Sequence, residues 1–215
     1  MQIDIWSDIV CPWCYLGKRR FEKALAGFEG RDDVRVSHRS FQLDPTRARG
    51  ETSRRRAMLQ SKYRLSEDQV RAMDHKMEQM AAAEGLEYHL TDAGLTGNTL
   101  DAHQLVHLAA SRGLEDKMLE RLYKAYFGEE RSVFDLDSLV RLVVEEGLDA
   151  TEVREGLTGG VYVDAVTRDL NEARSLGVTG VPFFVIDGRY GISGAQATDV
   201  FSRALTMAAE SSTAS

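Results

Sequence analysis

The 215-residue sequence has few cysteines, few prolines, no long apolar run and no excess of basic residues. A helix that spans a membrane needs about 20 consecutive apolar residues. No stretch approaches that length, so we expect no membrane association. The formal net charge of −7 argues against general nucleic-acid binding, because that function needs a positively charged face. The hydrophobic residues, 43% of the chain, are enough for one sizeable core.

The first residues lack the features of a secretory signal peptide. Met1 to Trp6 include no basic segment followed by a long apolar segment, which such a peptide requires. We therefore expect a cytoplasmic protein. Structural disulfides are rare in that compartment, so two closely spaced cysteines are expected to serve redox chemistry or metal binding.

The N-terminal part of the chain has the pattern of a β-α-β unit. Ile3-Asp4-Ile5-Trp6 is expected to be a short first strand, and residues 34–41, which alternate and contain β-branched side chains, are expected to be the second strand. Between them, apolar residues recur at helical spacing until about Gly30.

The C-terminal part has an α-β-β-α pattern. A helix is expected to end at Gly177. The apolar runs 183–186 and 190–193 follow, separated by an Asp-Gly dipeptide that is a strong hairpin signal. A last helix is expected over residues 197–209.

More than a hundred residues of helical pattern separate these two parts. Helix starts are indicated at a capping box that begins with Ser66, at Asn98, at Asp135 and at Asp149. The sequence therefore predicts an α/β protein with a thioredoxin-like fold (β-α-β … α-β-β-α) and a large inserted α-helical subdomain. We expect a discontinuous thioredoxin-like domain, residues 1–44 and 158–215, and an inserted helical domain, residues 45–157.

Cys11-Pro12-Trp13-Cys14 lies where the first strand passes into the first helix. Pro12 suits the first helical position, where its fixed φ and missing N–H cost nothing. A thiolate at Cys11 would meet unpaired backbone N–H groups and the positive end of the helix dipole, which stabilise it. Thiolates attack disulfides, so Cys11 is the candidate nucleophile. Cys14, one turn further along and facing inward, is placed to resolve a mixed disulfide.

Two other interpretations of the cysteine pair were weighed. The pair could be structural, but the strand–proline–helix context argues against that. The pair could also supply half of a zinc site, with His103 and His107 on one helix as the other ligands. Histidines on a helix with a regular apolar face are more often core-edge or surface residues, so the redox interpretation is preferred.

Val181-Pro182, just before the hairpin, is the second feature of the expected site. In a thioredoxin-type site a cis-proline segment lies against the start of the Cys-x-x-Cys helix, where its backbone can pair with an extended substrate. A cis bond before proline costs little, about 0.5–1 kcal/mol relative to trans. An ordinary trans proline at a strand start is the alternative, but the upstream Cys-Pro-Trp-Cys motif favours cis.

Two end segments resemble the DsbA-like oxidoreductases, in particular the cytoplasmic FrnE branch. These segments are Ser7-Asp8-Ile9-Val10-Cys11-Pro12-Trp13-Cys14-Tyr15 and Gly177-Val178-Thr179-Gly180-Val181-Pro182-Phe183-Phe184-Val185, the latter followed by Ser193-Gly194-Ala195-Gln196. Asn98-Thr99 with Ala102-His103 also matches a pattern of that branch.

The resemblance implies roles for several residues. Cys11 would be the nucleophile, Cys14 the resolving thiol and Pro182 the cis residue, with Val181 presenting its backbone to substrate. The insert would cap the active site. Pro12 and Trp13 would tune the redox poise. Because Trp13 stands where the periplasmic type has histidine, and the chain lacks an export signal, the strong oxidising character of that type is not carried over.

Some further residues have both a structural and a functional interpretation. Asn98 is expected to cap its helix, but it and His103 could point toward Cys11 and assist proton transfer there. Asp4, in the first strand, could relay the proton of Cys14 or be a surface carboxylate. A basic run is either a solvated helix face or a receptor for carboxylates of a thiol cofactor or an acidic peptide; it comprises Arg47, Arg49, Arg54, Arg55 and Arg56.

The sequence thus predicts dithiol–disulfide exchange with a protein or small-molecule substrate, coupled to a cellular thiol reductant or oxidant such as a low-molecular-weight thiol. We expect no metal and no cofactor beyond the redox-active Cys11–Cys14 disulfide. One alternative is a thiol-dependent isomerase of the 2-hydroxychromene-2-carboxylate type, against which the presence of both cysteines argues. The other is a zinc-binding or chaperone module.

Overall fold

The computed structural model describes residues 1–213 and divides into two compact units. One unit, here called the sheet unit, contains Met1–Phe41 and the chain from Asp169 onward; the other, the helical unit, is Gln42–Arg168. The second division falls later than the expected 157/158, inside a helix. Its physical reason is Asp169, in the middle of that helix, whose carboxylate accepts a hydrogen bond from the backbone N–H of Ser40 at 2.8 Å and so ties the helix to the sheet.

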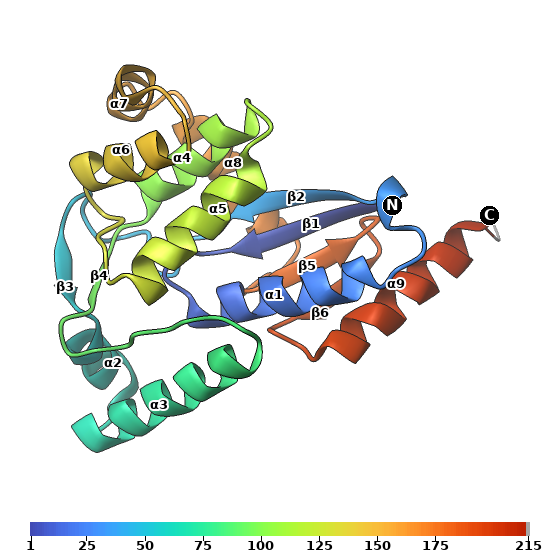
Figure 1. Cartoon of the computed structure of the whole chain (residues 1–215), viewed down its shortest axis with the longest axis horizontal. Helices are drawn as coiled ribbons and strands as arrows, with labels where there is room; N and C mark the ends of the chain where they lie inside the picture. Colours follow the sequence, from blue (N-terminus) through green and yellow to red (C-terminus); the bar gives the residue numbers. More distant parts are fainter. Residues whose placement is uncertain (214–215) are drawn as a thin grey trace. The chain divides into compact units, whose positions relative to one another are not determined.

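The sheet unit is built on four strands in the order β2-β1-β5-β6 (Figure 1). They are β1 (Gln2–Ser7), β2 (Arg35–Ser40), β5 (Phe183–Ile186) and β6 (Tyr190–Ser193). β1 runs parallel to β2 and antiparallel to β5, which pairs antiparallel with β6. The predicted hairpin is confirmed: residues 187–189 connect the paired strands β5 and β6, and Asp187 and Gly188 in this turn adopt positive φ, 49° and 65°.

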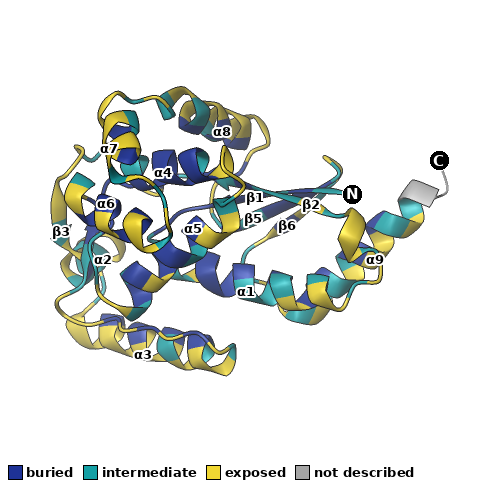
Figure 2. Cartoon of the chain, turned by 45° about the horizontal axis from the view of Figure 1, so that its top comes forward, coloured by how far each residue is buried: buried dark blue, intermediate teal, exposed yellow. Residues whose placement is uncertain are grey.

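Helices cover both faces of this sheet. Side chains along each strand point alternately to the two faces, so both faces carry apolar residues that the helices bury. Ile3 and Ile5 point to the face that carries α1 (Pro12–Ala26) and α9 (Thr198–Thr213). On that face three aromatic rings form the centre of the core, with ring centroids 4.7–5.8 Å apart: Phe21, Phe184 and Phe201. β1 and β5 are more deeply buried than β2 and β6 (Figure 2).

The opposite face of the sheet packs on α8 (Val163–Ser175). Trp6 and Val185 contact Ala173 there and form a second core cluster. The indole N–H of Trp6 donates to the backbone carbonyl of Asp169 at 3.1 Å, which satisfies a polar group that would otherwise be buried without a partner. The thioredoxin-like α/β arrangement expected from the sequence is therefore present in this unit.

The helical unit consists of the elements that lie, along the sequence, between the two segments of the sheet unit (Figure 1). Its helices are α2 (Arg55–Tyr63), α3 (Glu67–Ala83), α4 (Leu100–Ala110), α5 (Glu115–Tyr123), α6 (Leu136–Glu145) and α7 (Ala150–Thr158). The capping box at Ser66 is confirmed, as are the caps at Asp135 and Asp149. None of the helices in residues 1–213 combines the length and apolar content needed to cross a membrane.

Three local details differ from the sequence-based expectation. α1 ends at Ala26 rather than near Gly30. Asn98 is not the N-cap of α4: Thr99 occupies that position, and the Asn98 side chain accepts instead from the N–H of Leu100 at 2.8 Å. A small antiparallel sheet, β3 (Thr52–Arg54) with β4 (Leu95–Gly97), was not expected, because three-residue strands carry no readable alternation.

Candidate active site

The start of α1 positions Cys11. Cys11 is the N-cap residue in an extended conformation, with φ −89° and ψ 111°, and Pro12 occupies the first helical position. The Cys11 N–H donates to the carbonyl of Asp8 at 3.1 Å, and the Cys14 N–H to the carbonyl of Cys11 at 2.9 Å. The first backbone N–H groups of a helix have no intrahelical partner. A sulfur anion at Cys11 would therefore lie at the positive end of the helix dipole.

The two thiols are close together but not bonded to each other. Cys11 is 4% exposed and Cys14 is 1% exposed. Burial raises the pKa of Cys14 well above its ordinary value, and the hydrogen bond and the charge of Cys11 raise it further. Cys14 is therefore held in its protonated form.

Val181 lies beside Cys11, although 170 residues separate them along the chain. The Cys11 thiol donates to the backbone carbonyl of Val181, with 3.5 Å between Sγ and the oxygen. The Val181–Pro182 peptide bond is cis. The structure thus brings together the two segments that the sequence singled out.

The carboxylate beside Cys14 is Asp8, not Asp4. Asp4 is occupied by an ion pair with Arg39 at 2.8 Å, so its expected role as a proton relay is not supported. Asp8 is 1% exposed, and after burial and Cys11 its negative charge also raises the pKa of Cys14, while its backbone hydrogen bond lowers it. Sequence reasoning missed Asp8 because a loop position gives no periodic signal of burial.

Trp13 is the solvent-facing member of the motif, with 43% of its surface exposed. Pro12 beside it is half-buried. The residues between the cysteines therefore differ in kind: Pro12 belongs to the helix start, whereas Trp13 presents an apolar surface next to Cys11. Their expected effect on redox poise stays a prediction.

Asn98 and His103 both belong to the helical unit. The Asn98 side chain donates to the carbonyl of Arg47 at 2.6 Å and accepts from Gln42 at 3.1 Å. These bonds join the segment before β3 to the start of α4, which is a structural role. His103 is buried on α4. An action of either residue on Cys11 stays a prediction.

The basic run of the helical unit consists of arginines that have acidic or carbonyl partners. Arg49 pairs with Asp101 at 2.6 Å, and Arg55 and Arg56 share the buried Asp74. Arg47 pairs with Asp44, and Arg54 donates to the carbonyl of Ala93. These side chains act as crosslinks within the unit, and Arg49 and Arg54 are at the same time exposed to solvent. A role of the run as a receptor for carboxylates stays a prediction.

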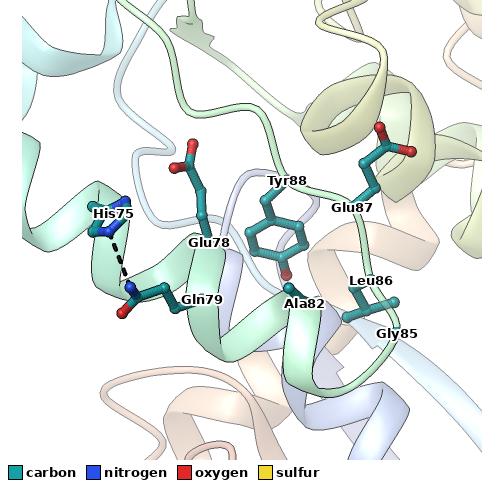
Figure 3. Close-up of a pocket in the computed structure, with 8 residues that line it drawn as sticks. All are labelled: His75, Glu78, Gln79, Ala82, Gly85, Leu86, Glu87 and Tyr88. Carbon is teal, nitrogen blue, oxygen red and sulfur yellow. Dashed lines mark hydrogen bonds between the residues drawn. The ribbon is translucent and has the colours of Figure 1, made fainter.

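An open groove of about 510 Å³ runs along α3 in the helical unit. His75 and Gln79 are hydrogen-bonded to each other at its rim, and Tyr88 forms part of its wall (Figure 3). Its lining contains neither cysteine. Within residues 1–213, no group of three or more His, Cys, Asp or Glu side chains is placed to hold a metal ion.

Comparison with known proteins found relatives of this chain. A family description of the DSBA-like thioredoxin domain matches residues 2–206. A probable DsbA oxidoreductase of Streptomyces coelicolor is 51% identical in sequence, with a TM-score of 0.93 over 97% of this chain and 89% of that one.

Two more distant structures share the fold. The cytosolic disulfide reductase DsbM of Pseudomonas aeruginosa is 17% identical, with a TM-score of 0.65 over 96% of this chain and 98% of that one; it has also been solved with GSH. A 2-hydroxychromene-2-carboxylate isomerase is 15% identical, with a TM-score of 0.73 over 99% and 98%.

Proposed function

Since this chain belongs to the DSBA-like thioredoxin domain family, we propose that it is a thiol–disulfide oxidoreductase that reacts through Cys11 and Cys14. One observation carries the proposal. Cys11 lies at the N-terminus of α1 with its sulfur 3.5 Å from the Val181 carbonyl, and Cys14 is buried one turn behind it. The pair therefore has one thiol at a helix start and, one turn behind it, a second thiol whose pKa is raised by burial.

The proposed reaction has two steps. The Cys11 thiolate attacks one sulfur of a substrate disulfide; the substrate S–S bond breaks, a mixed disulfide forms, and the other substrate sulfur leaves as a thiolate that takes up a proton. Cys14 then loses its proton and attacks the Cys11 sulfur, which releases the second substrate thiolate. Two electrons pass from the cysteine pair to the substrate, and Cys11 and Cys14 end joined in a disulfide. The reverse sequence oxidises a substrate dithiol.

The difference between the two cysteines supports this order of events. Burial keeps Cys14 protonated, so it does not compete with Cys11 for the incoming disulfide. Once Cys11 is in a mixed disulfide, its charge no longer opposes ionisation of Cys14. Cys14 can then give up its proton and complete the exchange.

The substrate is a protein or small molecule that contains a disulfide or a dithiol. The backbone of Val181 can pair with an extended substrate segment, and Pro12 and Trp13 set the redox poise. The cycle is restored by a cellular low-molecular-weight thiol, in line with the GSH described with DsbM. The protein acts in the cytoplasm, as DsbM is described to do, and the cycle needs no metal or nucleotide.

A thiol-dependent isomerisation is the competing proposal, because a 2-hydroxychromene-2-carboxylate isomerase shares the fold. That reaction moves no electrons to or from the protein. An isomerase activity that survived replacement of Cys14 by serine would favour it over the redox proposal.

A redox titration tests the proposal. The protein is equilibrated in buffers of different ratios of reduced to oxidised glutathione, free thiols are alkylated, and intact masses are measured. We expect one reversible transition between a form with two alkylated cysteines and a form that has lost two hydrogens and takes up no label. A pair that never interconverts refutes the proposed function.

A further inference from the structure

α1 contains a glycine in its interior, where most other residues would stabilise the helix more. Gly17 lies inside α1, six residues after Cys11. Glycine is unfavourable in a helix interior relative to alanine, because it loses more backbone freedom on folding. Its presence there therefore calls for a packing reason.

The packing reason is the close approach of Pro182. A Cβ atom built on Gly17 would lie 2.9 Å from Cγ of Pro182 and 3.3 Å from Cβ of Ala195. The first distance is shorter than carbon atoms tolerate. The proline ring is not a flexible side-chain end, so it could not move aside alone. The absence of a side chain at residue 17 is what lets the Val181–Pro182 segment lie against α1.

Two hydrogen bonds connect the same segment to α1 through residues 194 and 195. The N–H of Gly194 donates to the carbonyl of Pro182 at 2.8 Å, and Gly194 adopts a φ of 81°, which residues with a side chain rarely adopt. One residue further on, the Arg20 guanidinium donates to the carbonyl of Ala195 at 2.9 Å. Residues 194 and 195 are thus bonded to Pro182 on one side and to α1 on the other.

These contacts fix the place of the Val181 carbonyl relative to Cys11. Cys11 and Gly17 belong to one rigid helix, about 9 Å apart along its axis at 1.5 Å per residue. Val181 directly precedes the proline that touches Gly17, and its carbonyl oxygen is the hydrogen-bond acceptor of the Cys11 thiol. A shift of Pro182 away from α1 would carry that oxygen away from the sulfur.

We propose that Gly17, together with Arg20 and Ala195, is a positioning element that sets the distance between the Val181 carbonyl and the Cys11 sulfur. The inference rests on the proposed function for its catalytic meaning, but its geometric claim can be tested separately. Cys11 is 4% exposed and its sulfur contacts the Val181 carbonyl, so withdrawal of the carbonyl uncovers the sulfur and makes Cys11 react faster with a simple alkylating agent. It also displaces the backbone that is proposed to hold the substrate, which slows disulfide exchange.

The test uses Gly17→Ala with Gly27→Ala as its matched control. Gly27 follows the last residue of the same helix, and a Cβ there would lie 3.7 Å from the nearest atom, which is ordinary contact. We expect Gly17→Ala to alkylate faster than wild type at Cys11 with iodoacetamide at pH 6. We also expect it to exchange with oxidised glutathione roughly tenfold more slowly, because small misplacements of reacting groups cost rates of this order. Gly27→Ala should match wild type in both assays.

A second variant, Arg20→Met, covers the case in which Gly17→Ala fails to fold. It removes the bond to the Ala195 carbonyl and adds no atom near Pro182, so its effects should have the same directions and a smaller size. Unchanged alkylation and exchange in the folded variants, or equal changes in Gly17→Ala and Gly27→Ala, overturn the positioning role. A wild-type chain that exchanges no disulfide refutes the proposed function, and the alkylation rates then still decide the geometric claim.

Discussion

Replacing Cys14 with serine is expected to stop the proposed reaction at its mixed disulfide. Serine keeps the size and place of the buried side chain and removes the sulfur that attacks Cys11. The first step needs only the Cys11 thiolate at the start of α1, where Cys11 is the N-cap residue. The variant should therefore still attack a disulfide and then remain joined to half of it.

The size of the effect follows from the closeness of the two thiols. Well-oriented groups in one molecule react as though one were present at 10⁵–10⁸ M. Even if the effective concentration at Cys14 lies three orders below the bottom of that range, at about 10² M, it exceeds 1 mM external thiol by roughly five orders of magnitude. Release of the mixed disulfide in Cys14→Ser should thus become dependent on added thiol and slower by at least about a thousandfold.

In the wild type, the resolving step should also depend on pH. The pKa of Cys14 is raised, first by burial, so the fraction of Cys14 that can attack grows about tenfold per pH unit below that pKa. Reactions are quenched at several pH values and analysed by intact mass. We expect the mixed disulfide to accumulate at low pH in the wild type and at every pH in Cys14→Ser. Rapid release of substrate by Cys14→Ser without added thiol would refute this reasoning, and Cys11→Ser, which should form no adduct, is the control.

Three further predictions concern the stability of the fold. Arg131 and Arg121 lower the pKa of Glu145 from 4.5 to about 2, so this group stabilises the fold above pH 4.5 and its contribution is lost as the pH falls toward 2. Glu145→Gln should flatten that part of a plot of melting temperature against pH. Asp169→Ala leaves the N–H of Ser40 without its acceptor, which should reduce the free energy of unfolding by about 1–3 kcal/mol in a urea titration. Phe201→Ala removes a ring at the centre of the core and should cost about 3–5 kcal/mol in the same titration; a loss below about 1 kcal/mol would contradict the described packing.

The parts of the fold that were predictable are those with local signals. A helix start is marked by a residue and its neighbour three positions on, and Ser66, Asp135 and Asp149 all cap as such patterns predict. The Asp-Gly hairpin and the Cys-Pro start of α1 are local in the same way. Each of these signals lies within a few residues of the structure that it forms.

The parts that were not predictable depend on partners far away in the sequence. Arg55 meets Asp74 and Arg49 meets Asp101, and no pattern in a basic run shows that acidic residues will reach it. Asp8 gives no sign of its burial beside Cys14. The contact of Gly17 with Pro182 and Ala195 was likewise not predictable, because the sequence does not show whether a glycine inside a helix faces another segment or the solvent.

The meeting of Cys11 with Val181 lies between these two cases, because strand order alone dictates it. β1 and β5 are antiparallel neighbours, with Trp6 opposite Phe183. The last residues of β1 and the first residues of β5 therefore lie at the same end of the sheet. Cys11 comes shortly after β1, and Pro182 comes directly before β5. Both residues are therefore close to the same end of the sheet. A slip of one residue between these strands would turn every side chain of β5 to the other face, and Phe184 would leave its place against Phe21 and Phe201. The aromatic core thus holds the strands in the register that keeps the Val181 carbonyl beside the reactive sulfur.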